Sequence, residues 1–411
     1  MTSTLNPTGE HQAELPEIPE FPMARAAGCP FDPPPGLLAK QREGRLAKVR
    51  LWDGSTPWLV TRYDDQRTLL GDPRVSADAT RPGYPRIMPV TSQSSISFIM
   101  MDDPDHARLR RMVTAPFTIK RMAALRPAVQ KIVDDLIDDL LAGPQPADLV
   151  QEFALPVPSL VICELLGVPY ADHDFFQENS SVLIQRDATP EARGAAGENL
   201  RAYLDDLVGQ KTAAPADALL TGLGERVKAG ELTRDEVAQM GVLLLIAGHE
   251  TTANMIALGT LALLEHPDQL ALLRDTDDPK LVASAVEELL RYLNITHSGR
   301  RRVVLEDIEI AGQVLRAGDG IITPNDIGNR DADVFPDPGR LDLTRDARRH
   351  VAFGFGVHQC LGQPLARLEL QVVYSTLYRR IPTLRLATEV ERLSFKHNGS
   401  VYGVYELPVA W

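Results

Sequence analysis

The segment from Thr233 to Pro267 limits the possible folds more than any other part of this chain. Thr233 is a suitable N-cap, and Glu236 three residues later completes a capping box. No proline follows before Pro267, so the pattern predicts one helix of about 32 residues, close to 48 Å long. Its middle is apolar on nearly every side, which is typical of a helix buried in a large core.

Five residues at the centre of this helix do not fit a purely structural role. Gly248 is a weak helix former, and Glu250 brings a carboxylate to a place where burial is costly. His249, Thr251 and Thr252 complete this polar turn. One interpretation is a helix that turns a single polar face to solvent. A functional groove against the turn explains the pattern better.

Most of the remaining chain has helical periodicity, and two stretches are typical of β-hairpins. Residues 47 to 62 place β-prone runs around an Asp-Gly-Ser turn, and residues 302 to 323 repeat the pattern with two Ala-Gly turns. Residues 1 to 35 are polar and rich in proline, which predicts an irregular arm. We expect a mainly α fold with small β-sheets, in which residues 36 to 411 form a single domain.

Charge and cysteine content argue against several classes of protein. The net charge of −13 disfavours general nucleic-acid binding, which needs dense Lys and Arg. Cys29, Cys163 and Cys360 are too few and too far apart for a disulfide framework, which indicates a reducing compartment. The longest aliphatic run, residues 241 to 248, is far shorter than the roughly 20 residues of a membrane span. We therefore expect a cytoplasmic protein that does not enter a membrane.

The last cysteine, Cys360, lies in the sequence FGFGVHQCLG, residues 353 to 362. A helical pattern with Pro364 in its first turn follows directly, so we expect Cys360 where a loop becomes a helix. Unpaired backbone N–H groups and the helix dipole favour a thiolate there, and the glycines allow the backbone to approach a flat partner. An inert buried cysteine is one alternative. A zinc site assisted by His350 and His358 is another.

The loop matches the pattern F-x-x-G-x-[HR]-x-C-x-G through Phe353, Gly356, His358, Cys360 and Gly362. In this pattern it resembles the haem-binding loop of the cytochrome P450 superfamily, the haem-thiolate monooxygenases. The resemblance continues along nearly the whole chain through DPDHARLRR, AGHETT, EELLR and FPDPGRLDL, in the family's order. The phrase LPVPSLVICELLGVPYADH is similar to soluble actinobacterial members that act on secondary metabolites and foreign compounds.

The resemblance implies haem b, an iron protoporphyrin IX, between the long central helix and the cysteine loop. Cys360 would be the axial thiolate ligand of the iron, and the donors of four side chains would neutralise the two haem carboxylates. A buried Glu–Arg pair with a third arginine would hold the cysteine loop. The residues that the resemblance assigns to the cofactor are His106, Arg110, Arg302, Phe353, His358, Cys360 and Gly362, and the four donors among them are His106, Arg110, Arg302 and His358. The residues that it assigns to the structural group are Glu288, Arg291 and Arg340.

Glu250 and Thr251 match the acid and the alcohol of the family's oxygen-activating turn. Cleaving dioxygen requires protons, which a carboxylate beside a hydroxyl can relay, while a thiolate ligand supplies electron density to the iron. The implied reaction is hydroxylation, with O2, of an apolar or amphipathic small molecule such as a polyketide, terpenoid or sterol-like compound. The alternatives are a peroxide-driven or non-oxygenase member of the fold, a haem-binding sensor or electron carrier, and a zinc-bearing interaction protein.

Electrons must come from other proteins, because the chain has no G-x-G-x-x-G after a strand. The resemblance implies a separate ferredoxin and a ferredoxin reductase that draws on NAD(P)H. Residues 340 to 367 carry a local charge of +3, and residues 105 to 121 carry +4. We expect these two basic segments to dock an acidic ferredoxin, with solvated surface arginines as the alternative.

By resemblance, the substrate pocket draws on residues 84 to 99, residues 172 to 195, the turn after Arg291 and the loop near Val401. Most residues in these stretches are apolar or uncharged, which suits an apolar compound without selecting one. The individual pocket residues that we predict are Ala247, Leu293, Ile295 and Val401.

Overall fold

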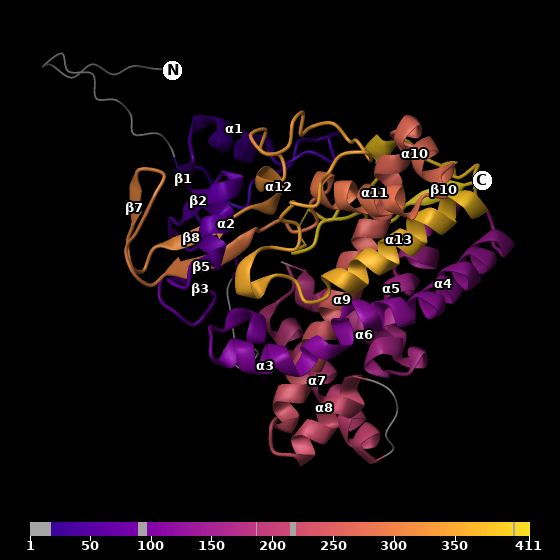
Figure 1. Ribbon diagram of the computed structural model, residues 1–411, viewed down its shortest axis with the longest axis horizontal. Coiled ribbons are helices and arrows are strands. Elements are labelled where there is room, and N and C mark those ends of the chain that lie inside the picture. The colour runs from indigo at the N-terminus through magenta and orange to yellow at the C-terminus, as the bar shows by residue number, and fades with distance from the viewer. Residues whose placement is uncertain (1–17, 89–96, 186, 214–218, 398) are drawn as a thin grey trace, which may run out of the picture.

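A computed structural model describes residues 18–88, 97–185, 187–213, 219–397 and 399–411. Helices form most of this part of the chain, and short strands form three small sheets beside them. Figure 1 shows the largest sheet within a lobe at the left, while the long helices pack across the rest of the molecule. The predicted fold class, mainly α with small β-sheets, is confirmed.

The described helices are α1 (Pro35–Glu43), α2 (Tyr63–Gly71), α3 (Asp105–Thr114), α4 (Ile119–Ala142), α5 (Pro156–Leu166), α6 (His173–Ile184), α7 (Pro190–Ala213), α8 (Leu219–Lys228), α9 (Arg234–Leu264), α10 (Pro267–Arg274), α11 (Pro279–Tyr292), α12 (Asn325–Gly328) and α13 (Gln363–Arg380). Short 3₁₀ or π turns are η1 (Phe98–Met100), η2 (Ala115–Phe117), η3 (Val150–Ala154), η4 (Tyr170–Asp172), η5 (Gly356–His358) and η6 (Val390–Arg392). The strands are β1 (Leu46–Lys48), β2 (Trp58–Val60), β3 (Val75–Ser76), β4 (Ala147–Asp148), β5 (Arg300–Val304), β6 (Ile308–Ile310), β7 (Gln313–Leu315), β8 (Gly320–Thr323), β9 (Arg385–Leu386) and β10 (Pro408–Ala410).

Helix α9 is the long helix predicted from the sequence, and its capping box forms as predicted. The side chain of Thr233 accepts a hydrogen bond from the backbone N–H of Glu236, and the Glu236 carboxylate accepts one from the N–H of Thr233 at 2.8 Å. Helices α5, α7 and α13 pack around it. It is long and apolar enough to cross a membrane, but 67% of its apolar window is buried inside the protein, as in the core helix of a globular domain.

Both predicted hairpins form. Leu46 pairs with Val60 in the first, and the five-stranded sheet that contains it has the order β1-β2-β8-β5-β3. In the second, the turn between β6 and β7 places Ala311 at φ 54° and Gly312 at φ 73°, the left-handed torsions that a two-residue hairpin turn favours. Strand β5 belongs to the five-stranded sheet, and Arg300 on this strand donates to the carbonyl of Ala352, next to the cysteine loop, at 3.3 Å.

The described part of the proline-rich arm, residues 18–34, is irregular but packed against the body of the protein. Phe21 is buried in a small apolar cluster under the sheet, and its N–H donates to the carbonyl of Arg50 at 2.8 Å. Arg25 is also buried; it donates to the carbonyl of Asn294 at 3.1 Å and lies over the Tyr402 ring at 4.1 Å. Proline content predicted the irregular backbone but gave no sign of this docking. Residues 1–17 lie outside the described residues.

Candidate active site

The cysteine loop is folded tightly just before α13. The N–H of Cys360 donates to the carbonyl of Phe353 at 2.8 Å, and Gly362 is the N-cap of α13 with Pro364 in the first turn, as predicted. Gly356 has φ 76°, and a Cβ on it would lie 2.3 Å from the carbonyl oxygen of Leu70. Only glycine allows the loop to pass α2 this closely.

The sulfur of Cys360 lines an open depression, yet it is deep enough for burial to raise the pKa of its thiol. Positive groups oppose that effect: Arg300 and Arg110 both lower the pKa of Cys360, as do the backbone N–H groups of Gly362 and Gln363. The first turn of α13 therefore favours the thiolate as the sequence predicts, but burial outweighs it. A thiolate here needs a cation as its direct partner.

The structure brings together the four donors predicted for the haem carboxylates. The rings of His106 and His358 lie 4.1 Å apart, and Nε2 of His106 and Nδ1 of His358 are buried without a hydrogen-bond partner among the described residues. Arg302 is buried, and its guanidinium donates at 2.8 Å to the carbonyl of Arg301. Burial lowers the pKa of Arg302 to about 10. The pKa of His358 is lowered to about 3, mainly because the ring is buried and further because of the charges of Arg302, His106 and Arg110.

This arrangement fits haem. Buried donors are normally satisfied, so two unpartnered ring nitrogens beside two arginines indicate an anionic partner such as a pair of carboxylates. Cys360 lies close enough to these donors for Arg110 to lower the pKa of the Cys360 thiol. His106, Arg110, Arg302 and His358 would hold the carboxylates of haem, and Cys360 would hold its iron.

Arg300 also belongs to this group, although the sequence reasoning missed it. Residues 300 and 302 lie on the same face of strand β5, since side chains alternate along a strand. The Arg300 guanidinium donates to the carbonyl of Ala352 at 3.3 Å, and it is the first of the groups that lower the pKa of Cys360. Strand periodicity, counted two residues back from Arg302, would have found it.

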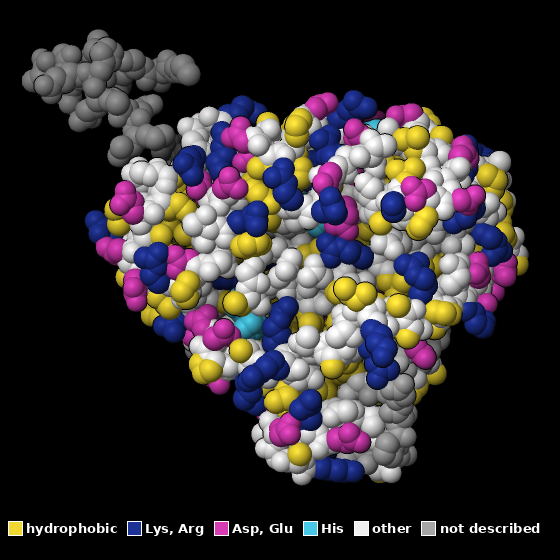
Figure 2. All heavy atoms as spheres, in the orientation of Figure 1, with side chains coloured by type: hydrophobic (Ala, Val, Ile, Leu, Met, Phe, Trp, Pro, Cys, Tyr) yellow, Lys and Arg dark blue, Asp and Glu magenta, His cyan; other side chains and the backbone are white. Residues whose placement is uncertain are grey.

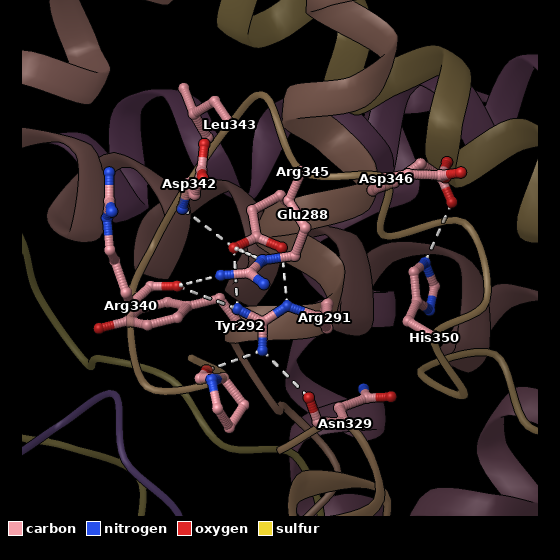
Figure 3. A network of polar contacts seen from close by, with 12 residues as sticks. Glu288, Arg291, Tyr292, Asn329, Arg340, Asp342, Leu343, Arg345, Asp346 and His350 are labelled. Atoms are coloured by element: carbon pink, nitrogen blue, oxygen red, sulfur yellow. Dashed lines mark hydrogen bonds and ion pairs between the residues drawn. The ribbon is translucent and has the colours of Figure 1, made fainter. Parts of the chain in front are cut away.

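The Glu288–Arg291 pair is completely buried, as the family resemblance implies, and is shown in Figure 3. Arg291 donates to both oxygens of Glu288 at 2.7 and 2.8 Å, and to the carbonyls of Asn329 and Pro338 at 3.0 and 2.9 Å. The helix thereby holds the segment that leads to the cysteine loop. These bonds satisfy a buried ion pair that would otherwise be costly.

The third member of this group is Arg345, so the prediction for Arg340 is wrong. Nε of Arg345 lies 3.2 Å from a carboxylate oxygen of Glu288, and its side chain is only 12% exposed. Arg340 is exposed, and Figure 3 shows its side chain directed away from Glu288. Arg340 contributes its carbonyl, which accepts from Arg291 at 3.2 Å. Both arginines lie in an irregular loop whose path decides which one reaches the carboxylate.

A second buried carboxylate, Glu287, was also missed. It accepts hydrogen bonds from Arg367 at 2.6 and 3.0 Å and contacts His350 at 3.1 Å. Although burial opposes the change, hydrogen bonds from His350 and Arg367 lower the pKa of Glu287 to about 2. The Arg367 guanidinium lies 4.6 Å from the centre of the Phe353 ring, which connects this cluster to the first residue of the cysteine loop. That contact gives Phe353 a place in holding the loop.

Glu250 and Thr251 lie at the middle of α9, but they point in different directions. The Thr251 hydroxyl donates to the carbonyl of Ala247 at 2.7 Å, and both residues keep exposed surface although they lie deep within the fold. This face of α9 therefore borders an open space. Glu250 is 6% exposed and accepts a hydrogen bond from Asn254 at 3.3 Å. The acid and the alcohol are neighbours in sequence that face different surroundings.

The predicted substrate residues are only partly brought together. Ala247 is exposed to the space beside α9, and Ile295 is partly buried, with its carbonyl accepting from the N–H of Tyr402 at 2.7 Å. Val401 is buried and forms a bridge with Thr296. Leu293 is 2% exposed and packs into the main core, so the structure does not place it at a pocket. Residues 89–96 and 186 of the predicted pocket stretches lie outside the described residues.

The described residues contain no group of three or more His, Cys, Asp or Glu side chains that could hold a metal ion. His350 is bound to Glu287, so it does not assist Cys360, and the zinc interpretation finds no support. Cys163 is buried, and burial raises its pKa to about 12, as expected for an inert core thiol. Cys29 is exposed and donates to Asp32 at 3.2 Å.

Comparison with known proteins agrees with this geometry. The family described as "Cytochrome P450" matches residues 175–383. The chain is 56% identical over 400 residues to cytochrome P450 GfsF of Streptomyces halstedii, covering 96% of this chain and 97% of that one, and the GfsF crystal structure superposes with a TM-score of 0.89. It is 54% identical to cytochrome P450-SU2 of Streptomyces griseolus, over 96% of this chain and 98% of that one.

A further solved structure is the mycinamicin VIII C21 methyl hydroxylase MycCI of Micromonospora griseorubida. It is 42% identical, has a TM-score of 0.90, and the match covers 96% of this chain and all of that one. Such identities over nearly the full length show common ancestry. The chain belongs to the cytochrome P450 family.

Proposed function

We propose that this P450 monooxygenase hydroxylates an apolar or amphipathic small molecule in the cytoplasm, using haem b bound through Cys360 and electrons from a separate ferredoxin. The observation that carries the proposal is the cluster of unpartnered buried donors beside a cysteine sulfur. Nε2 of His106 and Nδ1 of His358 together with Arg302 suit the carboxylates of haem, and no other use for them follows from the fold.

In this proposal the haem supplies the oxidant that attacks a C–H bond of the substrate, and a thiolate ligand favours O–O cleavage. The overall reaction consumes the substrate, O2, two protons and two electrons, and it yields an alcohol and water. Cys360 would hold the iron. On α9, the Thr251 hydroxyl borders the open space where substrate would lie, and Glu250 is the nearest acid along the helix.

Names of relatives support the substrate class without selecting a compound. The structure of MycCI contains mycinamicin VIII, and that of CYP105P1, another relative, contains filipin I. A third relative is named vitamin D3 dihydroxylase. These names agree with a polyketide, terpenoid or sterol-like substrate for this chain. The exposed face at Ala247 and the partly buried Ile295 are the uncharged surfaces that would contact it.

The first experiment is the carbon monoxide difference spectrum of the purified, reduced protein. We expect the strongly red-shifted Soret band of thiolate-ligated haem, and we expect Cys360→Ser to lose it while Cys163→Ser keeps it. The wild-type protein is then titrated with mycinamicin VIII, filipin I and vitamin D3, and any compound that shifts the Soret band is incubated with ferredoxin, reductase and NADH. A pigmented wild type without the band would refute the haem-thiolate proposal.

The depression beside Cys360 supports docking of a ferredoxin. It has a volume of about 560 Å³, and Arg110, Lys120 and Ile119 are among its lining residues. Ile119 is 83% exposed, and Val357 in the cysteine loop is 59% exposed, an unusual amount for large apolar side chains. Figure 2 shows more Lys and Arg than Asp and Glu side chains across the lower centre of this face. An apolar centre with basic surroundings suits an acidic partner protein.

Ion pairs within the protein lower the charge that both basic segments present, including Arg108 of residues 105–121, which is paired with Glu236. In residues 340–367, three of the five arginines are bound to acidic side chains within the protein, so the local charge of +3 overstates what a partner would meet. Those three ion pairs are Arg345–Glu288, Arg348–Asp346 and Arg367–Glu287. Arg349 and Arg111 remain exposed, and each donates to a backbone carbonyl.

Reversing these two charges tests the dock. We expect Arg111→Glu and Arg349→Glu to slow reduction by ferredoxin about tenfold at low salt, because complementary charges mainly accelerate encounter. Reduction by dithionite should not change, and salt should diminish the difference between variants. Arg385→Glu on β9 is the matched control. Equal rates of ferredoxin reduction for all three variants would exclude this surface.

A further inference from the structure

The Glu250 carboxylate lies in a polar pocket on the side of α9 away from Thr251. Its side chain is only 8% exposed. Asn254 donates to Oε2 at 3.3 Å, and Nε2 of His249 lies 3.8 Å from Oε1. The remaining neighbour is Lys396, whose Nζ lies 4.0 Å from Oε2. A buried carboxylate needs a counter-charge, and Lys396 supplies it from a segment 146 positions away.

The backbone fixes Lys396 in this place. Its N–H donates to the carbonyl of Gly403 at 2.8 Å, and its own carbonyl lies 3.3 Å from Nε2 of His297. Gly403 in turn lies directly against Asn254: a Cβ at position 403 would overlap Oδ1 of Asn254 at 1.7 Å. Only glycine permits this approach, so the C-terminal loop is held in contact with the turn of α9 that carries the acid.

Lys396 also faces the protein surface. Its side chain is 17% exposed, and Nζ lies 5.9 Å from the centre of the Tyr405 ring, which is itself 50% exposed. The ammonium therefore lies between the buried acid and solvent. On the other side of Glu250 along the helix is Thr251, whose hydroxyl borders the open space. The order from solvent inward is lysine, acid, alcohol.

His249 gives the pocket its fourth side. Nδ1 donates to the carbonyl of Leu245 at 2.8 Å, and Nε2 lies 3.1 Å from the hydroxyl oxygen of Ser180 on α6. Lys396 is the only Lys or Arg recorded within ion-pair distance of the acid among the described residues.

We propose that Lys396 is a positioning residue for Glu250 and forms the solvent end of the path by which protons enter the active site. This inference rests on the proposed monooxygenase function. The ammonium holds the carboxylate turned outward, where it can collect a proton from solvent, before Glu250 turns toward Thr251. Hydroxylation of R–H needs O2, two protons and two electrons and gives R–OH and water. When protons arrive late, the same O2 and electrons leave with two protons as H2O2.

The test compares Lys396→Met, Lys396→Arg and Lys48→Met in the holoenzyme. Lys48 is a matched control, since it is also a partly buried lysine and lies 3.9 Å from the centre of the Trp58 ring, far from α9 in the first hairpin. The substrate is whichever of mycinamicin VIII, filipin I and vitamin D3 shifts the Soret band, with ferredoxin, reductase and NADH. The readouts are product per NADH, H2O2 per NADH, and the effect of D2O on product formation.

We expect Lys396→Met to lower product per NADH about fivefold to tenfold, with a matching rise in H2O2 and a larger D2O effect. The spectral binding constant for substrate should not change. Lys396→Arg should restore coupling to within about twofold, since it keeps the charge, and Lys48→Met should behave as wild type. Lys396→Met values equal to those of Lys48→Met would overturn the proposal.

A double-variant cycle excludes a merely structural effect. If Lys396 acts through Glu250, Lys396→Met should add no further loss in a Glu250→Gln protein, whereas independent effects would multiply and would contradict the inference. Lys396→Gln replaces Lys396→Met if the latter lacks the carbon monoxide band. If none of the three compounds is a substrate, the division of NADH between H2O2 and water without substrate gives the same comparison. If the wild-type protein oxidises no NADH in either assay, the proposed function is refuted instead.

Discussion

Replacing Arg345 by Met should destabilise the protein far more than replacing Arg340 by Met. The two arginines lie five residues apart in one loop, but only Arg345 directs its guanidinium at Glu288, at 3.2 Å. The Arg340 side chain is exposed. Methionine keeps most of the aliphatic length at either position, so the comparison isolates the charge and its hydrogen bonds.

The magnitude follows from what the substitution leaves behind. Removing one partner of a buried ion pair typically costs about 3–5 kcal/mol. Glu288 retains two hydrogen bonds from Arg291, at 2.7 and 2.8 Å, and one from the N–H of Asp342 at 3.0 Å, which reduces the loss. Arg345 also donates to loop carbonyls, whose lost bonds add about 1 kcal/mol. We expect a loss of about 3 kcal/mol for Arg345→Met and within about 0.5 kcal/mol for Arg340→Met.

Urea unfolding followed by far-UV circular dichroism measures this difference. With a slope of about 3 kcal/mol per molar urea, the midpoint of Arg345→Met should fall by about 1 M and that of Arg340→Met should stay in place. The carbon monoxide band gives a second readout, because the loop after Arg345 leads to Cys360. If Arg340→Met lowers the midpoint as much as Arg345→Met, the assignment of Arg345 as the third partner is wrong.

Two further predictions concern charges around the cysteine loop. The folded pKa of Glu287 is lowered from 4.5 to about 2, so the stability that this carboxylate contributes is complete above pH 4.5 and is lost as the pH falls toward 2. The loss is about 3 kcal/mol. In Glu287→Gln the urea midpoint should therefore depend less on pH between 4.5 and 2 than in the wild type. Arg300→Gln should make the haem reduction potential more negative, because it removes a positive charge near Cys360. Arg301→Gln, on the opposite face of β5, should leave the potential unchanged. Equal potentials for the two variants would contradict the placement of Arg300.

Local signals in the sequence were sufficient for much of the fold. The ends of α9 follow from a capping box at Thr233 and from Pro267, and both hairpins follow from short turns between β-prone runs. These features depend on residues within a few positions of one another. The cysteine loop was predictable for a similar reason, since Pro364 and the glycines specify the change from loop to helix.

The remaining details depend on contacts between distant segments. Whether Arg340 or Arg345 reaches Glu288 is decided by the path of an irregular loop, which no periodicity describes. Leu293 is buried by packing in the main core, not by any property of its neighbours in sequence. The contact between Lys396 and Glu250 depends on Gly403 and Asn254 lying against each other. Local patterns carry no information about such pairings.

The positive charges near the cysteine loop and the one near Glu250 are separate from each other. Beside the cysteine loop, three guanidinium groups, Arg110, Arg300 and Arg302, match the three anions that haem binding would bring there, one thiolate and two carboxylates. His358 is then required only as a neutral donor, which agrees with its pKa of about 3. No positive charge is left over from that site to balance the acid on α9. The ammonium of Lys396 comes from the C-terminal loop instead, and we predict that changing it alters proton supply without disturbing haem binding.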